Sequence, residues 1–123
     1  MRKILVLDDS QTALFDIKNK LQEIDFEGEI LCVSNFFDAK RILESNPIDL
    51  AIIDLQMPEK NGADLIVHMK GKNEMKSIPI IVLTGSGDNS LLKTSLEPMV
   101  NYYLNKPVSQ EHLKELIQEL SDE

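Results

Sequence analysis

Four short runs of apolar residues divide the chain at regular intervals. They cover residues 4–7, 30–33, 50–53 and 80–83, and each is rich in β-branched and aliphatic side chains. None of the runs alternates with polar residues, which is typical of strands covered on both faces and favours a parallel sheet. A weaker run over residues 102–104 predicts a fifth strand.

Helical patterns separate these runs. Apolar residues recur at steps of three and four at Leu14, Ile17, Leu21 and Ile24, and again at Leu113, Leu116, Ile117 and Leu120. Weaker patterns predict helices over residues 36–44, 63–70 and 89–96. The alternation predicts five βα units in an α/β, doubly wound sandwich, with strand order 2-1-3-4-5. Ligands in such folds bind at the carboxyl ends of the strands.

Composition narrows the classes of function. The chain has 123 residues, 42% of them hydrophobic, which predicts one compact domain over residues 1–123. A net charge of -8 would repel a nucleic-acid backbone and an anionic membrane surface, so neither is an expected partner.

Two local features of the sequence predict the cellular compartment of the protein. The first apolar run is cut short by Asp8 and Asp9, which excludes a secretory signal peptide, and no stretch could span a bilayer. The single cysteine, Cys32, lies in an apolar run and is expected to be a buried, inert thiol. A cytoplasmic protein without membrane insertion is predicted.

Polar residues follow four of the five predicted strands. Asp8 and Asp9 come after the first, Asp54 after the third, Thr84 after the fourth and Lys106 after the fifth. Parallel strands end at one edge of the sheet, so these side chains should converge there. Crowded carboxylates repel one another unless cations compensate them. Lys106 is one such cation, and Mg²⁺, which prefers oxygen ligands, would be a second.

Each of these residues also has an ordinary structural explanation. Asp9 or Ser10 could cap the following helix, and Asp54 could form a turn. Thr84 could be a turn hydroxyl and Lys106 a solvated lysine. Independent turn residues are not expected to place three acids, a hydroxyl and a lysine on the same edge, so the joint placement favours a functional site.

Four motifs carry a resemblance to a known family. They are Val-Leu-Asp-Asp-Ser at 6–10, Asp-Leu-Gln-Met-Pro at 54–58 leading to Asn61-Gly62, Ile-Pro-Ile-Ile-Val-Leu-Thr at 78–84, and Tyr-Leu-Asn-Lys-Pro at 103–107. With these motifs the chain resembles response-regulator receiver domains of two-component phosphorelays along nearly its whole length. The resemblance implies a flavodoxin-like fold and a signalling domain rather than an enzyme, although receivers take part in their own phosphorylation.

The resemblance also implies a phosphorylation site and a metal site. Asp54 would be the phosphoacceptor. Mg²⁺ would be held by Asp8, Asp9 and Asp54, with Asp9 the more direct of the first two, and by the backbone carbonyl of Gln56.

Further residues would respond to the phosphoryl group. By resemblance, Thr84 and Lys106 would contact its oxygens, Tyr103 would rotate when Thr84 moves inward, and the Lys106–Pro107 bond would be cis. A sensor histidine kinase or histidine phosphotransfer protein would donate the group, and the imidazole of a phosphohistidine is a good leaving group for attack by a carboxylate.

Two other classes of function remain as alternatives. A haloacid-dehalogenase-like phosphatase also uses an aspartate and Mg²⁺, but it needs a second acid two positions after the nucleophile, where Asp8 is followed by Ser10. A phosphorylation-independent interaction domain of receiver ancestry is disfavoured by the intact set of site residues.

The motifs do not determine two properties, which are the character of the fourth helix and the lifetime of the phosphoryl group. Pro98 should end the fourth helix early, on the usual output surface of receivers, so the downstream partner or output domain stays open. Gln56 and Ser86 occupy positions that tune the lifetime of the acyl phosphate in the family, and that lifetime cannot be inferred from them.

Overall fold

The computed structural model describes residues 1–55, 57, 62–85 and 95–121. Five strands form one parallel sheet in the order β2-β1-β3-β4-β5, as predicted. The strands are β1 (Lys3–Leu7), β2 (Glu29–Val33), β3 (Leu50–Asp54), β4 (Ile80–Thr84) and β5 (Tyr102–Asn105). Each predicted strand lies within the observed one, because buried aliphatic runs leave little choice of conformation.

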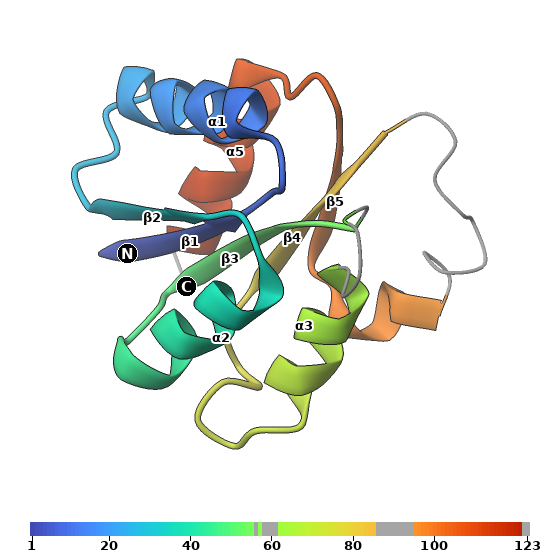
Figure 1. Ribbon diagram of the computed structural model, residues 1–123. Helices are drawn as coiled ribbons and strands as arrows, with labels where there is room; N and C mark the ends of the chain where they lie inside the picture. Colours follow the sequence, from blue (N-terminus) through green and yellow to red (C-terminus); the bar gives the residue numbers. More distant parts are fainter. Residues whose placement is uncertain (56, 58–61, 86–94, 122–123) are drawn as a thin grey trace.

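Helices cover both faces of the sheet. α1 (Gln11–Glu23) and α5 (Gln110–Ser121) pack on one face, and α2 (Phe36–Ser45) and α3 (Gly62–Lys70) pack on the other (Figure 1). Successive residues of a strand point to opposite faces, so each central strand supplies side chains to two separate hydrophobic clusters. This two-sided burial confirms the doubly wound α/β fold.

The region of the fourth predicted helix is described only in part. Ser95 and Leu96 are helical, and a 3-10 helix, η1 (Glu97–Met99), follows with Pro98 inside its first turn. The rest of the predicted helix over residues 89–96 lies outside the described residues.

Cys32 is only half-buried, so the prediction of a fully buried thiol is wrong. Its strand, β2, lies at the edge of the sheet, and its three middle residues are only partly buried. Cys32 borders a surface cavity together with Phe15 and Lys18. Burial raises the pKa of the thiol, and the positive charge of Lys18 opposes that rise. The composition of an edge strand can match that of a central one, which is why the sequence misled here.

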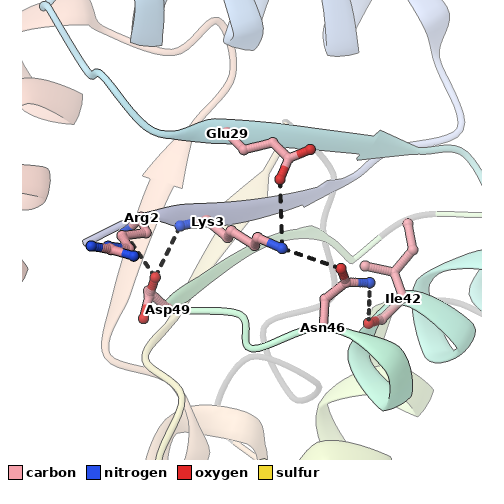
Figure 2. A network of polar contacts seen from close by, with 6 residues as sticks. All are labelled: Arg2, Lys3, Glu29, Ile42, Asn46 and Asp49. Atoms are coloured by element: carbon pink, nitrogen blue, oxygen red, sulfur yellow. Dashed lines mark hydrogen bonds and ion pairs between the residues drawn. The ribbon is translucent and has the colours of Figure 1, made fainter.

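A polar network joins the amino ends of β1 and β2 to the end of α2 and the segment before β3 (Figure 2). The carboxylate of Asp49 accepts hydrogen bonds from the backbone N–H groups of Arg2 and Lys3, at 2.8 and 2.9 Å. The ammonium of Lys3 lies 3.3 Å from the side-chain oxygen of Asn46 and 3.6 Å from the carboxylate of Glu29. The network fixes the start of β1 against β2 and the segment before β3.

Candidate functional site

The predicted site residues come together at the carboxyl edge of the sheet. Asp8 follows β1, Asp54 is the last residue of β3, Thr84 is the last residue of β4 and Lys106 follows β5. In the part of the chain that the structure describes, the buried polar or charged residues are Asp8, Asp54 and Thr84, which are 0%, 3% and 1% exposed. Buried polar groups are costly unless something compensates them, so their gathering at one edge indicates a functional site.

Three carboxylates form the acidic part of this site. Asp8, Asp9 and Asp54 each offer an oxygen, and these oxygens all lie within 4.8 Å of one another. Asp9 is exposed, whereas the other two are buried. Clustered carboxylate oxygens with one side open to water suit a hard divalent cation that keeps part of its hydration shell. Gln56, whose carbonyl is the fourth predicted ligand, lies outside the described residues.

Lys106 supplies the positive charge. Its ammonium nitrogen lies 2.8 Å from Oδ2 of Asp8 and 3.3 Å from Oδ2 of Asp54. Burial alone would lower the pKa of Lys106, but the contacts with Asp8 and Asp54 outweigh it and raise this pKa. The lysine therefore stays charged. The Lys106–Pro107 bond is cis, as predicted.

A backbone hydrogen bond holds Asp8, and a different residue, Ser10, caps α1. Oδ1 of Asp8 accepts a hydrogen bond of 3.0 Å from the N–H of Ser10, and Ser10 in turn caps α1 by accepting one from Ala13. Since Ser10 is the cap residue, Asp9 remains available for a ligand. The ordinary capping explanation therefore applies to Ser10 and not to the aspartates.

Thr84 makes a contact that the sequence did not predict. Its hydroxyl donates a hydrogen bond of 2.9 Å to Oδ1 of Asn105 and lies 3.5 Å from the carbonyl oxygen of Leu104. Thr84 and Asn105 are partners in the β4–β5 register. Asn105 directly precedes Lys106, but only the register of the two strands places it beside Thr84, so no motif could have identified it.

Tyr103 lies on the face of the sheet that α2 and α3 cover. It pairs with Val82 in the strand register, is half-buried and packs against the hydrophobic cluster of that face. Burial raises the pKa of its hydroxyl, and the negative charge of Glu97 adds to the rise. Its ring lies two register positions from Thr84.

A cavity of about 750 Å³ gives access to the site from the α1 side. Asp8 and Lys106 line it at the sheet edge, and Asp16 and Lys20, which form an ion pair of 2.6 Å, line it along α1. Asp8 and Lys106 can therefore be reached by a group that enters between α1 and the residues after β5.

The comparison with family models decides which family the chain represents. The model of the response regulator receiver domain matches residues 4–118, which includes every site residue described above. The chain belongs to the response-regulator receiver family. It is 37% identical over 117 residues to the chemotaxis protein CheY1 of Helicobacter pylori, covering 94% of each chain. It is 32% identical to the chemotaxis protein CheY homolog of Campylobacter jejuni, covering 96% of this chain and 91% of the relative.

Solved structures agree with this receiver assignment. A response regulator receiver domain protein from Clostridium thermocellum has a TM-score of 0.84 at 32% identity, over 98% of this chain and 94% of the other. The signal receiver domain of a DNA-binding response regulator from Colwellia psychrerythraea, at 20% identity, shows the fold alone, with a TM-score of 0.89 over the whole of both chains. Neither the phosphatase nor the phosphorylation-independent alternative is favoured by these relatives. Within the described residues, none of the helices combines the length and the apolar character that a bilayer crossing requires.

Proposed function

We propose that this receiver accepts one phosphoryl group on Asp54 from a phosphohistidine donor and that the modification changes its exposed face. The placement of Asp54 supports this most strongly. Its carboxylate is almost fully buried, yet it lies 3.3 Å from the ammonium of Lys106 and within 4.8 Å of an oxygen of the exposed Asp9. A carboxylate whose charge partners are already in place is suited to act as a nucleophile.

The transfer needs few protein groups. An oxygen of Asp54 forms a bond to phosphorus while the bond from phosphorus to the donor imidazole breaks, and the imidazole leaves with the bonding electrons. Lys106 and Thr84 would meet the negative charge that spreads over the phosphoryl oxygens. Asp8 keeps Lys106 in position through its contact of 2.8 Å.

The acidic cluster would hold the metal. Asp8, Asp9, Asp54 and the backbone carbonyl of Gln56 are the proposed ligands of Mg²⁺, which when bound would neutralise phosphoryl charge and so permit attack by a carboxylate.

The phosphoryl group would change the surface through Thr84 and Tyr103. An added negative group attracts the Thr84 hydroxyl, which vacates space beside β5, and Tyr103 would turn from its half-buried position into that space. Structures with and without a phosphoryl mimic test this rotation, and an unmoved Tyr103 would contradict it.

The partners follow from the family and remain part of the proposal. A sensor histidine kinase or a histidine phosphotransfer protein would act as donor in the cytoplasm, with residues 1–123 working as a single receiver domain. The relatives named as chemotaxis proteins extend the proposal to signalling of that kind.

Intact-mass spectrometry tests the proposed function. After brief incubation with Mg²⁺ and acetyl phosphate, the protein should gain the mass of one phosphoryl group, and hydroxylamine should remove it, because an acyl phosphate is labile to this reagent whereas a phosphate ester is not. Asp54→Asn should show no gain. Equal labelling of Asp54→Asn would mean that another residue is modified.

A further inference from the structure

We infer that Asn105 is a positioning residue that holds the Thr84 hydroxyl in its resting place and competes with the phosphoryl group for it. The inference rests on the proposed function, because it names a residue that opposes the switch. Asn105 lies inside the motif at residues 103–107, but the sequence assigned it no functional role, and the β4–β5 register places it beside Thr84.

The contact geometry singles out Asn105 as the partner of Thr84. The distance from Oγ1 of Thr84 to Oδ1 of Asn105 is 2.9 Å, within the usual range for a hydroxyl hydrogen bond. The carbonyl oxygen of Leu104, at 3.5 Å, is too distant to be a comparable acceptor. The N–H of Lys106 donates a bond of 2.7 Å to the carbonyl of Thr84, which fastens the end of β4 to β5. The backbone hydrogen bond therefore holds Thr84 and Asn105 side by side, whatever their side chains do.

Counting protons explains the competition. A threonine hydroxyl carries one proton, while the amide oxygen of Asn105 and the oxygens of a phosphoryl group are all acceptors. While Thr84 donates to Asn105, that proton is not available to a group on Asp54. Phosphorylation must therefore break this hydrogen bond before Thr84 can contact the phosphoryl oxygens.

The burial of the two partners is unequal, and this makes the contact reversible. Thr84 is 1% exposed, so in the resting state its hydroxyl depends on a protein acceptor. Asn105 is exposed, so its amide can bond to water once Thr84 leaves. The cost of release is then the net value of one hydrogen bond, which corresponds to roughly a two- to tenfold change in an equilibrium constant.

Asn105→Leu tests the inference, because leucine is similar in size to asparagine and offers no acceptor. The probe is beryllium fluoride with Mg²⁺, a mimic of the phosphoryl group, titrated into the whole protein. Asn105→Leu should bind the mimic roughly two- to tenfold more tightly than the unchanged protein. Asn73→Leu, at an exposed position in the connection between α3 and β4, is the matched control and should bind with unchanged affinity.

A double-mutant cycle separates this role from a general effect on the strand. Thr84→Val removes the hydroxyl but keeps the shape, so adding Asn105→Leu to it should change nothing further. Thr84→Ser keeps a hydroxyl, and in that background the effect of Asn105→Leu should return. If Asn105→Leu changes the affinity as much in the Thr84→Val background as in the unchanged protein, the inference is overturned, because Asn105 would then not act through the Thr84 hydroxyl.

The rotamer of Thr84 gives a second measurement that needs no variant of Thr84. Scalar couplings across the Thr84 side chain, measured by nuclear magnetic resonance without the mimic, should show one dominant rotamer in the unchanged protein and a mixture in Asn105→Leu. The same rotamer population in both proteins would overturn the inference. If the unchanged protein binds the mimic but Asn105→Leu binds it equally, only the role of Asn105 falls. If no form binds it, the proposed function falls as well.

Discussion

Lys106 forms ion pairs with two buried carboxylates, with its ammonium 2.8 Å from Asp8 and 3.3 Å from Asp54. The distance to Asp8 is the shorter one, so Asp8 is already compensated in the resting state. Asp9, which is exposed, has no such ion pair among the described residues. The three acids therefore differ in how much each still needs a cation.

Lys106→Ala should slow the gain of the phosphoryl group on Asp54 by roughly 10- to 100-fold without abolishing it. The variant removes one of the cations that oppose the developing charge, while the acidic cluster can still bind a metal. The rate of mass gain with acetyl phosphate measures this. Lys114→Ala, on the exposed side of α5, is the control. An unchanged rate in Lys106→Ala would show that the lysine does not act on the phosphoryl group.

Asp9→Ala should weaken Mg²⁺ binding by roughly tenfold or more, and Asp8→Ala should weaken it less. In the part of the chain that the structure describes, Asp9 has no paired ammonium, whereas part of the charge of Asp8 is compensated by Lys106. Titration calorimetry measures both affinities, with Glu111→Ala on α5 as a control for the loss of one negative charge. Unchanged affinity in Asp9→Ala would place the ion elsewhere.

At the scale of elements, the start of α3 lies directly against the end of β3. A side chain at Gly62 would overlap the carbonyl oxygen of Asp54 and the side chain of Ile53. The absence of a Cβ at this position allows α3 to begin beside the end of β3. The glycine of this motif, Gly62, thus has a packing reason.

Gly62→Ala should lower the free energy of unfolding by about 1–3 kcal/mol, because a fixed backbone carbonyl must move to admit the methyl group. It should also slow phosphorylation, since that carbonyl belongs to Asp54. Gly71→Ala is the matched control, because a Cβ there would make only ordinary contacts with the carbonyls of Val67 and His68. Urea unfolding of both variants decides this, and equal stabilities would contradict the close approach.

The network in Figure 2 predicts a pH-dependent contribution to stability at the opposite edge of the sheet. The N–H of Lys3 lowers the pKa of Asp49 most, burial opposes this, and the N–H of Arg2 lowers the pKa further. Because the pKa is lower in the folded state, the stabilisation is present above the unfolded value of about 3.9 and is lost as the pH falls through the folded value.

Asp49→Ala should therefore lower the free energy of unfolding by about 1 kcal/mol at neutral pH. The effect is this small because Asp49 is exposed and water screens its charge. The difference from the unchanged protein should stay constant between roughly pH 7 and pH 5 and shrink toward pH 3. Urea unfolding at these three values measures it, with Glu74→Ala on the α3–β4 connection as the control. A difference that grows toward low pH would contradict the assigned direction.

The strands and the site could be predicted because their signals are local. Apolar runs located all five strands, and the residues that follow them located the acidic cluster. The properties that were predicted wrongly or not predicted at all depend on how the strands are arranged beside one another. The exposure of Cys32 depends on β2 being at an edge, and the contact of Thr84 with Asn105 depends on the β4–β5 register. Neither property is encoded in a short stretch of residues.

For the whole molecule, one hydrophobic cluster packs on each face of the sheet, while the network of Figure 2 lies at its amino edge and the acidic cluster with Lys106 lies at its carboxyl edge. The amino edge carries a network of paired groups, whereas among the described residues the carboxyl edge carries three clustered acids and one lysine that contacts two of them. This unequal charge makes the carboxyl edge the place where a metal and a phosphoryl group would bind. Asp8 and Asp54 are both buried beside Lys106, and Asp54 is the one at the longer distance from its ammonium.

Borohydride trapping followed by peptide mass spectrometry tests the central claim most directly. An acyl phosphate on an aspartate is reduced to an alcohol, so after treatment with Mg²⁺, acetyl phosphate and borohydride the residue at position 54 should become homoserine. The peptides that contain Asp8 and Asp9 should stay unchanged, as should every peptide of a sample without acetyl phosphate. Reduction at another aspartate, with Asp54 intact, would contradict the assignment of the phosphoacceptor.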